Sequence, residues 1–347
     1  MADHPPPARV VWELTWRCTL RCTHCLVEGG PNDKVELDPA ESLALCDALA
    51  ALGTRTVTLT GGEPLLRPDW DVLARRLSDQ GIRVVLSTNG HGLNAANLAR
   101  AVAAGVRMAV LSLDGLAEAH DAVRRYPEAR ARRSSFAEVG DALRRLAETP
   151  ITRAVITSVD AHNLADLPGL HQHVKALGVQ RWQVQLAHAT GRQAAADMLS
   201  PAQNRALAAF LVEAARDPVL PPAVHETIGW LSRDEPILRS SGRSRAQVWL
   251  GSPCGRSVLA IEPDGGVKGC PNQVGAPFVV GQVREEPLAR IWQDRARWFW
   301  LNPPPSQAAG PCAPCALQTV CGGGCPCVAW ATTGALYNNP LCLRAAS

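Results

Sequence analysis

The sequence predicts an α/β protein: a partial (β/α)6 TIM-like barrel followed by a small cysteine-rich domain. Short apolar runs alternate six times with helical patterns over residues 9–216, which is typical of a parallel sheet with right-handed crossovers. Eight of the twelve cysteines then follow after residue 250. At 347 residues, the chain is long enough for one large domain and a smaller one, each with a core.

Six strands are predicted because each segment is short, rich in β-branched or apolar residues and bounded by turn signals. They cover 9–15, 56–60, 83–87, 107–113, 152–158 and 181–186. Helical patterns over 39–52, 70–80, 95–104, 136–147 and 164–177 separate them. A sixth helix over 200–215 has Ser200 as N-cap and Pro201 at its first position. In parallel barrels, the chemistry lies at the carboxyl ends of the strands.

Composition predicts where the domains begin and end. Residues 1–8 are proline-rich and expected to be disordered, the barrel covers 9–216, a Pro- and Arg-rich linker covers 217–250, and the cysteine-rich domain covers 251–347. The net charge is +3 and no basic run stands out, so neither nucleic acid nor a membrane surface is implied as a partner. The sequence shows no signal peptide and no apolar run near the roughly 18 residues of a membrane span. Twelve cysteines then indicate a cytoplasmic protein with metal-bound thiols.

Three cysteines directly after the first strand have the spacing of an iron–sulfur site. Cys18, Cys22 and Cys25 form Cys-x3-Cys-x2-Cys on a predicted loop. A [4Fe–4S] cluster is usually held by four cysteines, so three leave one iron open to a ligand that is not protein. A structural zinc site is the alternative, but zinc needs four closed ligands, and no fourth Cys or suitably spaced His lies nearby.

Polar motifs end the second, third and fourth strands. In 61–64, two glycines let the backbone approach a ligand, and a carboxylate on this surface turn could accept a hydrogen bond from an ammonium group. The motifs at 87–90 and 112–115 could present hydroxyl and carboxylate groups to a ribose or a carboxylate. Each motif alone is also a common turn. The candidates are Gly61, Gly62, Glu63, Pro64, Ser87, Asn89, Ser112 and Asp114.

Two glutamines and one further cysteine leave simpler readings open. Gln183 and Gln185 share a face of the sixth strand, so they either line the cavity or bond to neighbouring strands. Cys46 lies on the apolar stripe of the first helix and is expected to be a small buried hydrophobic residue.

The cysteine trio followed by Gly-Gly-Glu-Pro after the second strand resembles the radical S-adenosylmethionine (SAM) enzymes. The resemblance implies that the open iron binds the amino and carboxylate groups of SAM, and that one electron cleaves SAM to methionine and a 5′-deoxyadenosyl radical, which takes a substrate hydrogen. It assigns 61–64 to the methionine amino group and the motifs at 87–90 and 112–115 to further cofactor contacts. It adds His24, and also Arg124, which matches an arginine that pairs with the cofactor carboxylate in some relatives; a solvated arginine fits Arg124 nearly as well.

The later cysteines resemble the seven-cysteine SPASM domain, which holds two auxiliary clusters. By position, the first auxiliary cluster is assigned Cys254, Cys270 and Cys325, and the second Cys312, Cys315, Cys321 and Cys342, both expected to be [4Fe–4S]. Some relatives have another cysteine shortly before the position of Cys254, and its absence here leaves an iron open to substrate, water or Cys327. Cys327 is therefore a ligand, a hydrogen-atom donor to a substrate radical, or a buried thiol. Pro271 and Asn272 follow Cys270 where the sulfatase-maturing branch has a catalytic Asp, which counts against that activity.

The resemblance implies an enzyme of natural-product maturation that modifies a ribosomally made peptide by oxidation, crosslinking, decarboxylation or epimerisation. The alternative substrate is a sugar-like or other small metabolite. An iron–sulfur electron carrier or redox sensor is a third reading, although a carrier has no need of Gly-Gly-Glu-Pro. A flavodoxin- or ferredoxin-type reductant is an expected partner. So is a separate leader-peptide-binding protein, because the barrel begins too early for a fused one.

Overall fold

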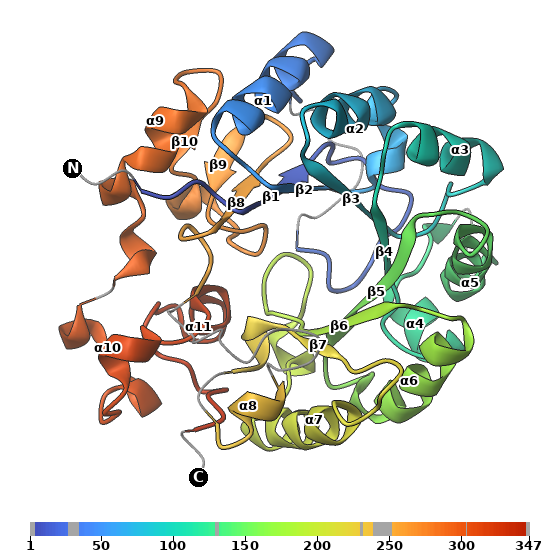
Figure 1. Ribbon diagram of the computed structural model, residues 1–347. Coiled ribbons are helices and arrows are strands. Elements are labelled where there is room, and N and C mark those ends of the chain that lie inside the picture. Colours follow the sequence, from blue (N-terminus) through green and yellow to red (C-terminus); the bar gives the residue numbers. More distant parts are fainter. Residues whose placement is uncertain are drawn as a thin grey trace.

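The structure, a computed structural model, describes residues 4–26, 35–128, 132–229, 232–238, 252–302 and 304–344. One open ten-stranded sheet runs through it in the order β10-β9-β8-β1-β2-β3-β4-β5-β6-β7, with helices on its outer side (Figure 1). The strands are β1 (Arg9–Glu13), β2 (Thr56–Thr60), β3 (Arg83–Thr88), β4 (Met108–Ser112), β5 (Thr152–Val159), β6 (Arg181–Leu186), β7 (Ala223–Val224), β8 (Val258–Ile261), β9 (Gly266–Lys268) and β10 (Gly281–Gln282).

The predicted helices lie between these strands. The helices are α1 (Pro39–Ala51), α2 (Trp70–Asp79), α3 (Ala95–Ala103), α4 (Ala117–Val123), α5 (Ser135–Leu146), α6 (Leu167–Ala176), α7 (Pro201–Ala214), α8 (Glu235–Leu238), α9 (Leu288–Gln293), α10 (Gln318–Cys321) and α11 (Pro326–Thr333). The predicted partial barrel is confirmed. The prediction missed α4, and the helix expected from residue 164 begins instead with a 3-10 turn before α6.

The parallel part of the sheet is longer than the six predicted strands. β8 pairs in parallel with the free edge of β1, with Arg9 opposite Val258 and Trp12 opposite Ile261, and β7 pairs in parallel with β6. β9 and β10 then continue the sheet in antiparallel fashion. The cysteine-rich region therefore shares the barrel sheet, and the stretch expected as a linker supplies β7 and α8. The domain boundaries themselves stay a prediction.

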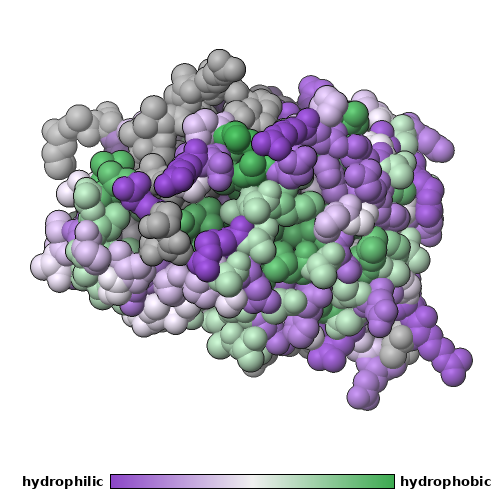
Figure 2. All heavy atoms as spheres, turned by 90° about the horizontal axis from the view of Figure 1, so that it is seen from below, coloured by the Kyte–Doolittle hydropathy of each residue, from purple (hydrophilic) through white to green (hydrophobic). Residues whose placement is uncertain are grey.

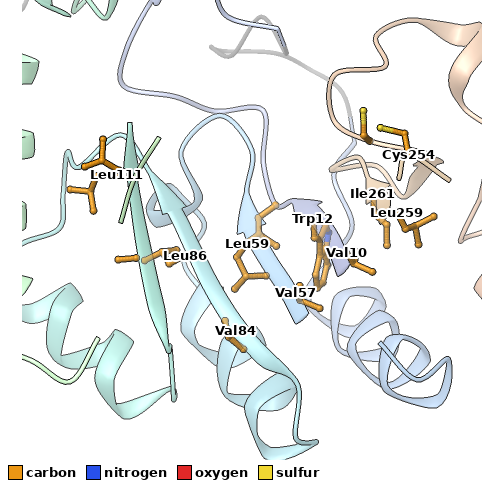
Figure 3. Close-up of a cluster of buried hydrophobic side chains, with 14 of the residues drawn as sticks. Val10, Trp12, Val57, Leu59, Val84, Leu86, Leu111, Cys254, Leu259 and Ile261 are labelled. Atoms are coloured by element: carbon orange, nitrogen blue, oxygen red, sulfur yellow. The ribbon is translucent and has the colours of Figure 1, made fainter. Parts of the chain in front are cut away.

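Side chains alternate between the two faces of the parallel strands. Figure 3 shows outward-facing members such as Trp12, Leu59 and Leu86, which are fully buried in the main hydrophobic core. The residues between them face inward and line a cavity: Val11, Glu13, Thr58, Thr60, Val85, Ser87, Val110, Ser112, Ile156, Ser158, Gln183 and Gln185. Because strand side chains have a period of two, one set of strands supplies both the core and a cavity lined by polar and apolar side chains.

Local caps fix the starts of α1 and α7 where the sequence places them. Asp38 Oδ1 accepts from Glu41 N–H at 2.8 Å, and Glu41 Oε2 accepts from Asp38 N–H at 2.8 Å. Ser200 and Gln203 form the same reciprocal pair at the start of α7. Such caps contribute about 1 kcal/mol each, since they satisfy N–H groups that the first helical turn leaves unpaired.

Residues 4–8, for which disorder was expected, lie against α9. Trp292 Nε1 donates to the Pro5 carbonyl oxygen at 3.0 Å, and Gln293 Nε2 donates to that of His4 at 3.0 Å. The His4 ring lies 5.2 Å from the Trp292 ring. Residues 1–3 are outside the described part of the chain.

Over the described residues, none of the helices combines the length and apolar character needed to cross a bilayer. Figure 2 shows the face on the α7 side of Figure 1, where hydrophobic and hydrophilic residues are interspersed.

Candidate active site

One cavity of about 380 Å³ inside the barrel is lined by both groups of cysteines. Cys18, Cys22 and Cys25 come from the loop after β1, and Cys254, Cys270 and Cys325 come from the C-terminal region. The sequence assigns these residues to separate clusters more than two hundred positions apart. The fold brings both groups to the wall of a single cavity.

The cysteine loop is held first by the glycine motif after β2. Gly62 N–H donates to the Thr15 carbonyl oxygen at 2.7 Å, and Glu63 N–H donates to that of Arg17 at 2.8 Å. A Cβ on Gly62 would lie 2.3 Å from the Arg17 carbonyl oxygen, far inside contact distance. The two glycines are therefore required for backbone packing against the cysteine loop, and both also line the cavity.

Loops from the far side of the barrel hold the rest of this segment. Arg21 N–H donates to the Arg125 carbonyl oxygen at 2.8 Å, just after α4. Beyond β6, Arg192 N–H donates to the Cys25 carbonyl oxygen at 3.0 Å, and Arg192 Nε donates to that of Cys22 at 2.9 Å. Gly191 and Arg192, in the loop after β6, thus hold the cysteine loop in place.

The surroundings of the three thiols fit an iron–sulfur cluster. Leu20 N–H donates to Cys18 Sγ at 3.5 Å, and Asn89 Nδ2 donates to the same sulfur at 3.7 Å. Burial raises the pKa of the Cys22 thiol to about 11, although Arg124 acts in the opposite direction. Metal binding must therefore displace the proton of the Cys22 thiol, whereas the N–H donors stabilise negative charge on Cys18 Sγ.

The expectation that Glu63 lies on a surface turn is wrong, because its side chain is fully buried. Oε1 accepts from Thr88 Oγ1 at 2.7 Å and from Leu65 N–H at 3.2 Å, and Oε2 accepts from Asn89 N–H at 2.9 Å. Glu63 is not among the residues that line the cavity. Its carboxylate holds the loop after β3 in place, and its expected pairing with the cofactor ammonium group stays a prediction.

Asp114 is likewise a buried anchor and not a cavity-lining ligand. Its carboxylate accepts from Arg124 Nε and from Ser158 N–H at 2.7 Å, and lies 3.3 Å from His24 Nε2. Burial would raise the pKa of Asp114, but Arg124 and His24 hold it well below its usual range. The cavity wall includes both His24 and Arg124, so Arg124 is not a solvated arginine: Asp114 fixes its guanidinium beside the cysteines.

Some of the other predicted cofactor residues line the cavity, and others do not. Ser87, Asn89 and Ser112 line the cavity, where their polar groups are available to a ligand. Pro64 is buried and begins the 3-10 turn Pro64–Leu66. Both glutamines of β6 also line the cavity. Gln185 Nε2 in addition donates to Ser158 Oγ of the neighbouring strand at 3.1 Å, so Gln185 both lines the cavity and bonds to a neighbouring strand.

The first auxiliary group is tightly assembled and includes the leftover cysteine. The sulfurs of Cys254, Cys270 and Cys327 all lie within 4.8 Å of one another, and those of Cys270 and Cys327 are 3.3 Å apart. Cys325 is 2% exposed and lines the cavity together with Cys254 and Cys270. Three buried thiols therefore meet in one place, with the buried Cys325 beside them. Cys46, by contrast, is fully buried in the main core as expected.

The second auxiliary group gathers nearer the surface. Burial raises the pKa of the Cys321 thiol to about 11, with further contributions from Cys342, Cys312 and Cys315. Gln318 Nε2 donates to the Cys312 carbonyl oxygen at 2.8 Å and ties α10 to this group. The four cysteines assigned to the second cluster are thus neighbours in the fold, and their role as its ligands stays a prediction.

Sequence reasoning missed several residues beside these groups. Glu226, just after β7, lines the cavity, and its Oε1 accepts from Cys254 Sγ at 3.5 Å. Tyr126 packs against Leu20 and Cys22 beneath the cysteine loop. No local motif marks Glu226. The sequence contains several arginines near Tyr126, but the net charge of the whole chain is only +3 and so does not point to a local basic surface.

Gly62→Ala tests the close packing of the two loops. Because the added Cβ meets backbone on the cysteine loop, we expect the loop to shift, iron at this site to be lost, and SAM affinity to fall at least about tenfold, or ~1.4 kcal/mol. Iron analysis and SAM titration measure both effects. Gly140→Ala on α5, where the nearest contact is an ordinary 3.4 Å to Arg144, is the matched control. Wild-type iron content and affinity in Gly62→Ala would contradict this packing.

The burial of Glu63 should make the stability of the protein depend on pH. Burial raises the pKa of Glu63 from 4.5 to about 7, despite its hydrogen bonds from Asn89, Thr88 and Leu65. Between these values the folded protein keeps a proton that the unfolded chain has released. The free energy of unfolding should therefore fall by up to ~3 kcal/mol as the pH rises from about 4.5 to about 7. Denaturant unfolding of wild type and Glu63→Gln across this range isolates the slope, with exposed Glu118→Gln as control. Equal slopes in all three proteins would refute the assignment.

Comparison with known proteins identifies this arrangement. The family model of the radical SAM superfamily matches residues 12–170, and that of an iron–sulfur cluster-binding domain (SPASM) matches residues 253–316. An AdoMet-dependent heme synthase from Methanosarcina barkeri (strain Fusaro / DSM 804) is 31% identical, over 97% of this chain and 96% of that protein. Mycofactocin maturase MftC from Mycobacterium ulcerans (strain Agy99) is 32% identical, over 92% of this chain and 83% of that protein.

Solved structures share the fold. Streptococcus suis SuiB bound to S-adenosylmethionine matches with a TM-score of 0.73 at 16% identity, over 97% of this chain and 76% of that one. Native anSMEcpe with bound AdoMet matches with a TM-score of 0.75 at 15% identity, over 97% and 95%. The chain belongs to the radical SAM superfamily, as an enzyme with a C-terminal SPASM iron–sulfur domain.

Proposed function

We propose that this radical SAM enzyme oxidises a ribosomally made peptide, with the first auxiliary site as the electron acceptor. The observation that carries the proposal is the single cavity, whose wall includes both the SAM-side cysteines and three cysteines of the first auxiliary group. A substrate bound there lies between a site that removes a hydrogen atom and a site that can take an electron. An electron carrier needs no such cavity.

The proposed reaction balances as a two-hydrogen oxidation. With a cluster on Cys18, Cys22 and Cys25 and with SAM bound, one incoming electron would yield a 5′-deoxyadenosyl radical able to take one hydrogen atom from the substrate. The substrate then loses a proton to solvent and one electron to the first auxiliary site, and a new bond or double bond forms. The barrel positions the substrate: Arg124 and Asn89 line the cofactor side of the cavity, and Gln183 and Gln185 line the barrel wall.

The amide side chains of the cavity favour a peptide substrate. Neutral amides of Gln183, Gln185 and Asn272 line the cavity, and amide groups pair naturally with peptide N–H and C=O groups. Asn272 is held by a hydrogen bond of 3.2 Å with His188. The relative named mycofactocin maturase also supports this proposal, because a maturase converts a precursor into a finished product.

A tetrapyrrole is the second candidate substrate, because relatives named heme synthase match nearly the whole chain. This is a small metabolite, the class that the sequence left as the alternative. Haem precursors carry several carboxylates, which need cationic partners. Among the described cavity-lining residues, the arginines are Arg9 and Arg124, and Asp114 already pairs with Arg124. Because so few cationic groups are available for its carboxylates, a tetrapyrrole is a weaker candidate substrate than a peptide.

Mass spectrometry separates the two candidates. Reconstituted enzyme with SAM and dithionite is incubated either with short peptides encoded beside its gene or with iron porphyrins. We expect a peptide to lose two hydrogens for each 5′-deoxyadenosine formed, because one leaves as an atom and one as a proton and an electron. Turnover of a porphyrin, followed by absorption spectroscopy, with every peptide left unchanged would overturn the peptide proposal.

We further propose that an acidic flavodoxin- or ferredoxin-type reductant docks beside Tyr126. Tyr126 packs on Cys22, and its hydroxyl lies 3.0 Å from His91 Nδ1, next to Glu138 and Arg133 near the surface. Arg125 and Arg132 are exposed in the same stretch. Electrons entering here would cross one layer of side chains to reach the SAM-side cysteines. A separate leader-peptide-binding protein stays a prediction.

Charge reversal tests the docking surface. Arg125→Glu with Arg132→Glu should slow reduction by an acidic flavodoxin at least about tenfold at low salt, and the difference should shrink at high salt because exposed charges are screened. Reduction by dithionite should stay unchanged. Arg216→Glu, at an exposed arginine just beyond the end of α7, is the control. Equal flavodoxin rates in the double variant and the control would exclude this surface.

A further inference from the structure

We propose that Cys327 is the fourth cysteine ligand of the first auxiliary site, which is therefore closed by this chain and leaves no iron open to substrate. Cys254, Cys270, Cys325 and Cys327 are the complete ligand set. The inference deepens the proposed function, since it decides that the site takes an electron and does not bind the substrate, but the ligand assignment itself stands without any substrate.

Contacts between sulfurs carry the assignment. Over the described residues, the sulfurs of Cys254, Cys270 and Cys327 form the one group of three or more potential ligand atoms within 4.8 Å of one another. Cys325, the third cysteine that family resemblance gives to this site, precedes Cys327 by two residues at the start of α11 and lines the cavity with Cys254 and Cys270. All four are at most 6% exposed, and buried thiolates of this kind need a cation to balance their charge.

The backbone explains how neighbouring cysteines reach different sites. Gly322, Gly323 and Gly324 have φ of 59°, 81° and 78°, a left-handed run that turns the chain between Cys321 and Cys325. Cys325 then caps α11, Pro326 occupies its first position, and Cys327 lies in its first turn. The proline restricts φ within Cys-Pro-Cys, so two ligands of one site can be held two residues apart.

Position argues against the two other roles of Cys327. A hydrogen-atom donor must reach the substrate, yet Cys254, Cys270 and Cys325 line the cavity while Cys327 does not. An inert core thiol is exemplified by Cys46, whose sulfur lies 3.9 Å from the Leu73 carbonyl oxygen on α2. The Cys327 sulfur instead lies within 4.8 Å of the Cys254 and Cys270 sulfurs, 3.3 Å from that of Cys270.

Four cysteine ligands have a chemical consequence. With all irons coordinated by protein, the substrate has no vacant coordination position and is held only by contacts in the cavity. The site is then restricted to electron transfer. The same thiols are also close enough for one zinc ion, because sulfurs at about 2.3 Å from zinc lie within ~4.6 Å of one another. Zinc takes no electron, so metal identity is part of the test.

The test uses Cys327→Ala in the full chain, with Cys46→Ala as matched control. Three [4Fe–4S] clusters correspond to about 12 irons, and loss of one site to about 8. We expect Cys46→Ala to keep wild-type iron and electron paramagnetic resonance spectra. Cys327→Ala should lose iron toward the lower value, or keep the cluster with an altered spectrum that shifts again when cyanide is added. The wild-type auxiliary signal should not respond to cyanide.

The other possible outcomes also test whether Cys327 is a ligand. Wild-type iron and spectra in Cys327→Ala, or zinc in the wild-type site, would overturn the proposal. If Cys327→Ala does not fold, Cys327→Ser keeps the size of the side chain, and its oxygen ligand should still change the spectrum. These readouts use no substrate, so they remain valid if the peptide proposal fails.

Discussion

The structure depends on one constraint: a loop that presents three cysteines to a metal cluster leaves its own backbone groups without secondary-structure partners. Buried N–H and C=O groups must be paired. Here Thr15, Arg17, Cys22 and Cys25 offer their carbonyl oxygens to the loops after β2 and β6, while Arg21 N–H donates to the segment after α4. The barrel brings these loops together, because parallel strands deliver their carboxyl ends to the same side. The conformation of the cysteine loop therefore depends on loops from across the barrel.

Two buried carboxylates extend this support to the cofactor side. Glu63 holds the backbone of Asn89, and Asn89 in turn donates to Cys18 Sγ. Asp114 holds Arg124 and His24 at the cavity wall. Neither carboxylate lines the cavity itself. The motifs that look like ligands in the sequence thus combine residues available to the cofactor with residues that orient them.

The sequence predicts the six inner strands well because their side chains alternate strictly between core and cavity. It misses β7 and β8 because a two-residue strand in a proline-rich stretch and a four-residue strand between cysteines carry little periodic signal. The error at Glu63 has a different origin. A polar residue in a turn reads as exposed, and only tertiary packing shows that Thr88 and Asn89 enclose it. The role of Cys327 likewise depends on Cys254 and Cys270, which are distant in sequence.

The central claim is that an electron leaves the substrate across one cavity to the first auxiliary site. Freeze-quenched electron paramagnetic resonance during a single turnover tests it most directly, with a peptide substrate and an enzyme whose auxiliary sites start oxidised. The account predicts that a reduced signal from the first auxiliary site appears at the same rate as the oxidised product, with one electron gained for each product molecule. Product formation while that site stays oxidised would contradict it.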